Sequence, residues 1–170
     1  MTARLYAGAD LVGRLLSAWR ARAVLPFVRG ELLDLACGDN RLVRRRGAGV
    51  GVDIVAYEGA DTVCPDLERL PFADASFDTV TILAALNYFE RPEAVLREVR
   101  RVLKPDGRLL ISLLHKGASR LWHAVRERHS TPRPALDAAE LDACLRAAGL
   151  RVTSRRSFML GLNTIYCIER

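Results

Sequence analysis

The sequence predicts an α/β protein built on a doubly wound, mostly parallel sheet that closes with an antiparallel pair of strands. Two observations support this fold class. Short apolar runs typical of buried strands alternate with segments of helical spacing through most of the chain, a pattern that favours parallel strands joined by helices. The last two strand-like segments, 151–158 and 163–168, lie too close together around Gly161 for a parallel crossover, so they should pair antiparallel.

The first expected element is a helix over residues 9–23. Its apolar side chains recur at helical spacing and leave a polar opposite face; they are Leu11, Val12, Leu15, Leu16 and Trp19. Pro26 ends this helix or starts a second turn. Residues 1–30 are therefore expected to form an N-terminal helical cap.

Two short apolar runs follow, and both are typical of buried parallel strands. Residues 31–36 end in a glycine-containing turn, a helix is expected over 41–46, and the second strand spans 50–55. Asp53 and Asp66 lie only 13 positions apart, whereas a parallel crossover takes about a dozen residues or more. The helix between the second and third strands is therefore expected to be shortened or absent, and the third strand to be short, displaced or absent.

The middle of the chain continues the alternation. Residues 74–83 are a turn that runs into a strand, and residues 109–114 are a further apolar strand. Between them, Pro92 begins a helix, and the segment 104–107 ends it. The apolar stripe of this helix has the spacing of a buried helix face; it consists of Val95, Leu96, Val99, Val102 and Leu103.

The last third begins with a helix that carries signals at both ends. Asp137 and Glu140 have the spacing of an N-cap and the acid that reciprocates it, and Gly149 suits a left-handed C-terminal cap. One face of this helix is apolar and holds Leu141, Cys144, Leu145 and Ala148. Residues 137–170 are therefore expected to be a helix followed by the strand pair.

Length and composition fit one globular domain. The chain has 170 residues, half of them hydrophobic, and a net charge of +6. Nearly all basic residues are arginines spread along the chain, which does not favour a nucleic-acid surface. The four cysteines lack metal or redox spacing, and we expect no metal site. There is no signal-peptide pattern and no apolar run long enough to span a membrane, which favours a cytoplasmic protein.

Informative polar residues accompany the first two strands. In doubly wound sheets, ligands bind outside the carboxyl ends of the strands. Asp34 and the turn 36–40 lie at that end of the first strand, and Gly38 would let a ligand approach the backbone closely. Asp53 ends the second strand, where a carboxylate can accept both hydroxyls of a ribose. These residues predict a site for a ribose-containing cofactor.

Three ordered motifs span residues 32–41, 66–78 and 97–107. The first, Leu-Leu-Asp-Leu-Ala-Cys-Gly-Asp-Asn-Arg, resembles the first motif of class I S-adenosylmethionine-dependent methyltransferases. The second resembles the acidic loop and fourth strand of that family, and the third resembles the helix and turn before its fifth strand. The resemblance covers 31–114 and implies that this segment is the cofactor-binding core of a Rossmann-like methyltransferase fold.

The resemblance implies a role for each matching position, with S-adenosylmethionine as the cofactor. Asp34 and the 36–40 loop would face its methionine part, and Asp53 would hold its ribose. Ile54 would lie against the adenine, Asp66 and Leu67 at its edge, and Leu83 near the sulfonium. The implied cofactor-binding residues are therefore Asp34, Ala36, Cys37, Gly38, Asn40, Asp53, Ile54, Asp66, Leu67 and Leu83.

Structural alternatives stay open at four of these positions. Gly38 could serve only a tight turn, and Asp53 could be a surface residue at a strand end. Asp66 could simply cap the turn that follows it. Cys37 is expected to pack as a small hydrophobic residue and not to react.

Two departures from the family pattern concern the shape of the site. Ala36 and Asn40 stand where the first and third glycines of the motif are usual. An alanine at positive φ costs on the order of 1 kcal/mol, so we expect a differently shaped loop. The family usually has a helix between its second and third strands, and the short connection here would leave the adenine side more open.

The acceptor side offers fewer signals, and its catalytic residues are not identified. Asn87, Tyr88 and His115 are candidates for the acceptor pocket, and His115 could be a general base or a solvated loop residue. We expect residues 115–136 to act as a lid together with the N-terminal helix, the alternative being plain core packing. Residues 87–89 lack the prolines of the motif found in enzymes that methylate amino groups of nucleic acids, which disfavours a DNA base.

The favoured function is methyl transfer from S-adenosylmethionine to an oxygen or nitrogen nucleophile of a small-molecule or carrier-linked acceptor. A catalytically inactive methyltransferase-like partner module and an RNA methyltransferase remain alternatives. A nicotinamide-dependent dehydrogenase is disfavoured, because the Gly-x-Gly-x-x-Gly pattern fails at two of its three glycines. The chain is expected to be a single domain over residues 1–170, as a monomer or homodimer.

Overall fold

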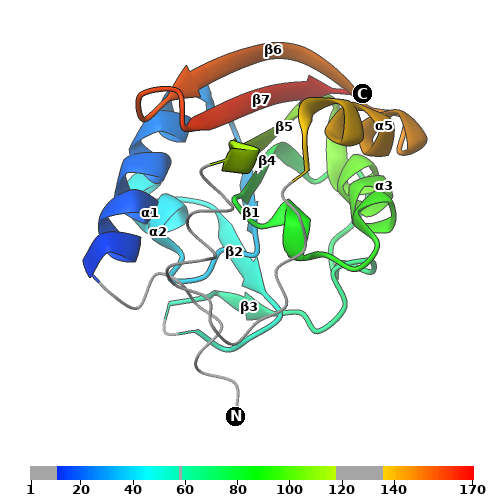
Figure 1. The fold of residues 1–170 in the computed structure, drawn as a ribbon. Helices are drawn as coiled ribbons and strands as arrows, with labels where there is room; N and C mark the ends of the chain where they lie inside the picture. Colours follow the sequence, from blue (N-terminus) through cyan, green and yellow to red (C-terminus); the bar gives the residue numbers. More distant parts are fainter. Residues whose placement is uncertain (1–10, 58, 118–135) are drawn as a thin grey trace.

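The computed structural model describes residues 11–57, 59–117 and 136–170 and shows a seven-stranded sheet (Figure 1). The strands are β1 (Leu32–Leu35), β2 (Val50–Asp53), β3 (Thr62–Val63), β4 (Phe77–Leu83), β5 (Leu103–Leu114), β6 (Arg151–Phe158) and β7 (Asn163–Glu169). Their order is β3-β2-β1-β4-β5-β7-β6. The first five strands run parallel, and β7 pairs antiparallel with both β5 and β6. The predicted fold class is confirmed.

Helices cover both faces of this sheet (Figure 1). α1 (Leu11–Val24) and α2 (Arg41–Arg46) pack on one face, and α3 (Pro92–Val102) and α5 (Ala138–Ala147) pack on the other. Two short 3-10 helices, η1 (Leu25–Phe27) and η2 (Leu86–Tyr88), lie in the connections. None of the described helices is both long enough and apolar enough to cross a membrane.

The face under α3 and α5 is apolar. Alternate strand residues point to it, and many of them are fully buried, for example Leu33, Leu35, Ile82 and Ile111. α3 adds the stripe expected from its spacing, with buried Val95, Leu96, Val99 and Val102. This side of the sheet holds the larger part of the core.

The predicted caps of α5 are both present. The side chain of Asp137 accepts the backbone N–H of Glu140 at 2.8 Å, and the side chain of Glu140 accepts that of Asp137 at 2.7 Å. Gly149 follows the helix with φ +70°, a conformation that glycine adopts without strain. The local sequence signals are therefore sufficient to locate this helix.

The face under α1 and α2 carries polar groups in its interior. Alternation along the strands places five buried polar side chains here: Asp34, Thr79, Thr81, Ser112 and Asn163. Apolar residues such as Leu32 and Leu110 lie on the same face. Asp53, at the end of β2, also points to this side, since its neighbour Val52 belongs to the opposite core. The two faces of one sheet thus differ in chemistry.

The helix expected near the N-terminus is present as α1, but its apolar stripe points to solvent. Four of its apolar side chains are more than half exposed: Leu11 (73%), Val12 (51%), Leu15 (60%) and Trp19 (51%). The helix instead buries Gly13, Ala21 and Val24. The predicted polar opposite face is therefore wrong in part. That side holds the half-buried Ser17 and Arg20, but small and apolar residues make its contact with the sheet.

The third strand is as short as the spacing predicted. β3 has two residues and pairs with the end of β2, where Val52 lies opposite Thr62 and Asp53 opposite Val63. The described residues between the two strands form turns and no helix. The expectation of a missing crossover helix is confirmed for these residues.

β5 begins earlier than expected. The strand starts at Leu103, directly after α3, so the segment 104–107 lies inside it. Phe77 pairs with Leu103, but the next pair is Thr79 with Arg108. The segment 104–107 therefore forms a bulge in β5, because several of its residues lie opposite one residue of β4.

Candidate functional site

The turn between β1 and α2 holds three residues in the left-handed conformation. Ala36, Gly38 and Asn40 have φ values of +55°, +55° and +53°. Ala36 thus adopts the conformation that we expected alanine to avoid, and that expectation is wrong. The backbone N–H of Cys37 donates to the carbonyl of Val52 at 3.1 Å. This bond ties the turn to β2 and helps to offset about 1 kcal/mol of backbone strain at Ala36.

Asp53 holds the same turn from the end of β2. Its Oδ2 accepts the backbone N–H of Gly38 at 2.9 Å, and its Oδ1 accepts that of Val55 at 3.2 Å. The residue is only 6% exposed, which rules out the alternative of a simple surface residue. Each carboxylate oxygen can accept more than one hydrogen bond, so Asp53 keeps acceptor capacity for a ligand.

Asn40 anchors the short connection between β2 and β3, a role that sequence reasoning missed. Its Nδ2 donates to the carbonyl of Gly59 at 2.7 Å and to Oδ2 of Asp61 at 2.8 Å. The same oxygen of Asp61 accepts the backbone N–H of Gly51 at 2.8 Å. The available sequence signal was a carboxylate, Asp61, in a connection too short for a helix.

Asp34 lies inside β1 and is 3% exposed. Its Oδ1 accepts the hydroxyl of Thr81 at 2.5 Å. Burial raises the pKa of Asp34 to about 7; the Thr81 hydrogen bond opposes this rise, and the negative charges of Asp53 and Asp39 add to it. Near neutral pH this carboxyl is therefore partly protonated, and a cationic ligand beside it would favour the ionised form.

Cys37 behaves as the small hydrophobic residue that was expected. Burial raises the pKa of its thiol, and the nearby charges of Asp34, Asp53 and Asp61 raise it further. The thiol therefore stays protonated and is a poor nucleophile. All four cysteines of the chain are free.

The residues predicted for the adenine side differ in their exposure to solvent. Ile54 is 54% exposed and leaves an uncovered apolar surface at the end of β2. The side chain of Leu67 is buried in the core, so only its backbone can meet a ligand. Oδ1 of Asp66 accepts the backbone N–H of Glu68 at 2.9 Å. Asp66 therefore does perform the capping role that was its structural alternative, while its side chain remains exposed.

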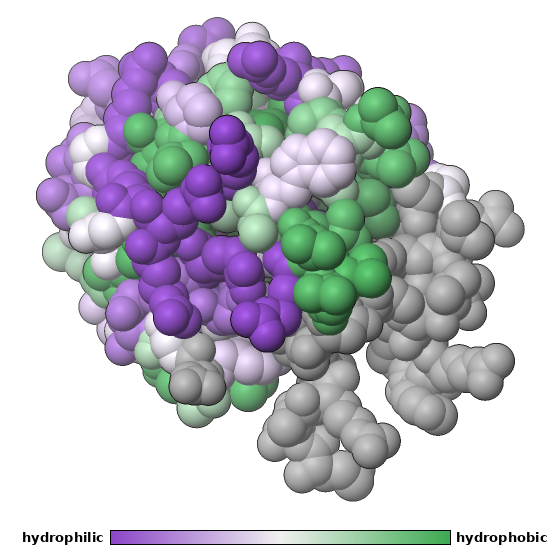
Figure 2. Space-filling view, turned by 90° about the vertical axis from the view of Figure 1, so that its left-hand side faces the viewer, coloured by the Kyte–Doolittle hydropathy of each residue, from purple (hydrophilic) through white to green (hydrophobic). Residues whose placement is uncertain are grey.

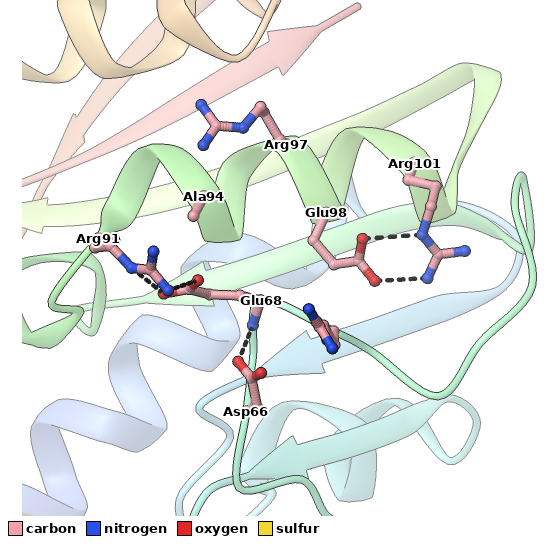
Figure 3. Close-up of a pocket in the computed structure, with 8 residues that line it drawn as sticks. Asp66, Glu68, Arg91, Ala94, Arg97, Glu98 and Arg101 are labelled. Atoms are coloured by element: carbon pink, nitrogen blue, oxygen red, sulfur yellow. Dashed lines mark hydrogen bonds and ion pairs between the residues drawn. The ribbon is translucent and has the colours of Figure 1, made fainter.

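A surface hollow of about 510 Å³ lies against α3 and the turn after β3 (Figure 3). It is lined by Asp66, Glu68, Arg69, Arg91, Ala94, Arg97, Glu98 and Arg101. Glu68 bonds Arg91 at 2.5 and 3.0 Å, and Glu98 bonds Arg101 at 2.6 and 2.9 Å. Ligand pockets are mostly apolar with a few polar groups, whereas this hollow is lined almost wholly by charged residues that largely pair with one another. It is therefore a poor candidate for the cofactor site.

The candidates for the acceptor pocket lie in the segments that follow β4 and β5. Tyr88 is 51% exposed, and Asn87 is half-buried beside it in η2. His115 is exposed at the end of β5, where its backbone N–H donates to the carbonyl of Leu162 at 2.9 Å. Leu83 is half-buried at the end of β4 and packs against the α1-side core. The acceptor roles stay predictions.

Two predicted segments fall largely outside the described part of the chain. Residues 118–135 make up most of the expected lid over 115–136, and residues 1–10 belong to the expected N-terminal cap. The lid and its alternative of core packing therefore remain predictions.

Comparison with known proteins gives a family and many curated relatives, two of which illustrate the range. Residues 32–111 match a family model described as a methyltransferase domain. The malonyl-[acyl-carrier protein] O-methyltransferase of Erwinia pyrifoliae is 35% identical over an alignment of 145 positions that covers 78% of this chain and 55% of that protein. The demethylmenaquinone methyltransferase of Thermotoga maritima is 34% identical over an alignment of 125 positions that covers 60% of this chain and 55% of that protein. The chain thus spans about half the length of these curated relatives.

A solved structure shares the fold. The 1,6-didemethyltoxoflavin-N1-methyltransferase of Burkholderia thailandensis, solved with bound S-adenosylhomocysteine, gives a TM-score of 0.68 at 18% identity and covers 95% of this chain and 80% of that one. The site described above fits S-adenosylmethionine. It offers a buried acid with spare acceptor capacity, a second buried acid that a positive charge would ionise, and the uncovered Ile54.

The evidence for the family comes from the sequence and from the fold. The motifs follow one another in the expected order within residues 32–111, which the family model matches. The strand order is that of a doubly wound sheet with an antiparallel end. Over residues 32–111 this chain is a methyltransferase domain of the S-adenosylmethionine-dependent type.

Proposed function

We propose that this chain transfers a methyl group from S-adenosylmethionine to an oxygen or nitrogen nucleophile of a small-molecule or carrier-linked acceptor. One observation carries the proposal. The buried Asp53 carboxylate bonds the left-handed turn at Gly38 and retains acceptor capacity at the carboxyl ends of β1 and β2. This is the edge of a doubly wound sheet at which ligands bind.

The proposed contacts follow from the chemistry of each side chain. Asp53 would accept the ribose hydroxyls, and the exposed Ile54 would lie against the adenine. Asp34 and the 36–40 turn would meet the methionine part, whose positive charge would favour ionised Asp34. The bound cofactor supplies an electrophilic methyl group on a sulfonium, and the remaining task of the protein is to orient a nucleophile and exclude water.

The acceptor class is supported by the relatives. One relative is named for a carrier-linked acceptor and another for demethylmenaquinone, a small molecule. The oxygen nucleophile in the proposal is supported by the first, which is named an O-methyltransferase, whereas other relatives are named C-methyltransferases. Asn87, Tyr88 and His115 are the side chains that we expect near the acceptor. His115, exposed at the end of β5, is the candidate general base for a hydroxyl acceptor.

Calorimetric titration with S-adenosylmethionine and with S-adenosylhomocysteine tests the cofactor site. We expect the wild type to bind both, and Asp53→Ala to lose about a hundredfold in affinity, since it removes two charge-assisted hydrogen bonds. Asp53→Asn keeps one acceptor oxygen and should lose less.

Asp53 also stabilises the turn at Gly38. A control variant must therefore distinguish a direct contact of Asp53 with the cofactor from an indirect effect through this turn. Asp61→Ala removes the carboxylate that ties the neighbouring connection but is not expected to touch the cofactor, so it should bind nearly as wild type. Unchanged binding by a folded Asp53→Ala variant would refute the assigned role. A folded wild type that binds neither ligand would favour the inactive partner module.

A further inference from the structure

The outer face of α1 presents an apolar ridge to solvent. Its members, which we call the α1 ridge, are Leu11, Val12, Leu15 and Trp19. Their spacing of one, four and eight positions places them on one side of the helix, and the residues that α1 buries, Gly13, Ala21 and Val24, lie on the opposite side. Monomeric proteins rarely expose contiguous apolar patches, and such patches mark sites of interaction.

Arginines of α1 and of its neighbour α2 accompany the ridge. α1 and α2 pack against each other and together contain seven arginines and no acidic residue. Four of these are exposed and have no acidic partner among the described residues: Arg14, Arg22, Arg44 and Arg45. Figure 2 views the molecule from the side on which α1 lies in Figure 1 and shows hydrophobic residues gathered beside a broad hydrophilic region.

We propose that the α1 ridge and the arginines of α1 and α2 dock this protein on an anionic membrane surface. Helices that lie in a membrane interface combine leucine and tryptophan on one face with arginine or lysine beside them. Anionic headgroups attract such basic residues, and the apolar side chains enter the boundary between headgroups and acyl chains. The inference concerns a surface that lies outside the proposed cofactor site and does not depend on methyl transfer.

The shape and charge of this surface favour a bilayer over other occupants. The ridge is convex, because it is the outer side of a single helix that packs on the sheet. A protein partner would need a matching groove, whereas a lipid interface accommodates a convex ridge without one. A nucleic acid would pair with the arginines but would leave the four apolar side chains in water.

Binding to vesicles tests the proposal with a reporter inside the ridge. The chain has two tryptophans, so Trp122→Phe leaves Trp19 as the only one. On vesicles of phosphatidylglycerol and phosphatidylcholine, the fluorescence of Trp19 should shift to the blue, and the protein should float with the vesicles. On phosphatidylcholine alone, and at high salt, binding should fall steeply.

Matched variants identify the contributing residues. Leu15→Asp, introduced into the single-tryptophan background, should weaken binding at least tenfold, while Val63→Asp, an exposed apolar residue on β3, should not. Arg44→Gln with Arg45→Gln should weaken binding about fivefold for each arginine removed. Arg97→Gln with Arg100→Gln, on α3 at the opposite face of the sheet, removes the same charge and should change binding little.

Several outcomes would overturn the proposal. They are no binding to either vesicle, equal binding to neutral and anionic vesicles, or equal loss in the α3 and α2 arginine variants. A dimer in solution that Trp19→Asp dissociates would assign the ridge to a second copy of the chain instead. Calorimetry with S-adenosylhomocysteine on Leu15→Asp separates this result from the proposed function, because cofactor binding should be unchanged.

Discussion

α1 and α3 lie on opposite faces of one sheet and use their apolar residues in opposite ways. Both have apolar side chains at helical spacing. The stripe of α3 is fully buried, and Arg101 of this helix pairs with Asp74 and Glu98. The stripe of α1 is exposed, and Arg14 and Arg22 have no acidic partner among the described residues. Periodicity therefore identifies a stripe but does not decide which side of a helix meets the core.

The strand residues under these helices show the same contrast. The α3 side is apolar, and the α1 side contains the buried polar group that includes Asp34 and Thr81. Polar groups in a low-dielectric interior must be hydrogen-bonded or change their ionisation. The α1 side is accordingly where burial raises the pKa of a carboxyl group, that of Asp34, and Asp34 belongs to the first of the three motifs.

The largest expected effect is a pH dependence that arises on the polar face. The pKa of Asp34 is about 7 in the folded protein, against 3.8 as its ordinary value. Between about pH 4 and pH 7 the unfolded chain loses this proton and the folded chain keeps it, so the contribution of Asp34 makes the protein less stable as pH rises. Across that window the loss amounts to about 4 kcal/mol.

Denaturation with urea at several pH values measures this effect as the difference between wild type and Asp34→Asn. Because asparagine does not titrate, the variant should gain stability relative to wild type from pH 4 to pH 7 and show no further gain above that. Parallel stability curves for the two proteins would contradict the assignment.

The next effect compares the two helices directly. Leu96→Ala on α3 removes a fully buried side chain and should lower the free energy of unfolding by about 3 kcal/mol. Leu15→Ala on α1 removes a side chain that is 60% exposed and should change it by no more than about 0.5 kcal/mol. Equal losses in chemical denaturation would show that the α1 ridge is covered in solution.

The smallest effect concerns the polar network around Asn40. A Cβ on Gly51 would lie 2.0 Å from Oδ1 of Asn40, which is 1% exposed and held by Gly59 and Asp61. Gly51→Ala should therefore destabilise the protein by about 2 kcal/mol. Gly117→Ala, where a Cβ meets open space, is the matched control and should be nearly neutral in thermal denaturation.

A second background sharpens this prediction. Asn40→Gly restores the residue usual in the family motif and removes the group that the new methyl would meet. In that background Gly51→Ala should cost little, giving a coupling energy between the two sites. Additive effects would mean that the strain arises elsewhere.

Much of the fold and part of the site could be read from short stretches of sequence. The order of strands and helices, the caps of α5 and the two-residue β3 depend on spacing and turn chemistry within a few residues. The placement of Asp34 and Asp53 at one end of the sheet follows from parallel strands. Local patterns determine such features because each residue has only two freely rotating backbone dihedral angles, so that few regular conformations are available.

The rest was decided by contacts between distant residues. The contact of Asp34 with Thr81 joins positions 47 residues apart, and that of Asn40 with Asp61 joins positions 21 apart. The outward direction of the α1 ridge depends on the small residues that fit against the sheet. By itself the sequence determined which elements form and that Asp34 and Asp53 lie at one end of the sheet. The tertiary structure decided ionisation and exposure, because desolvation depends on every group that packs around a side chain.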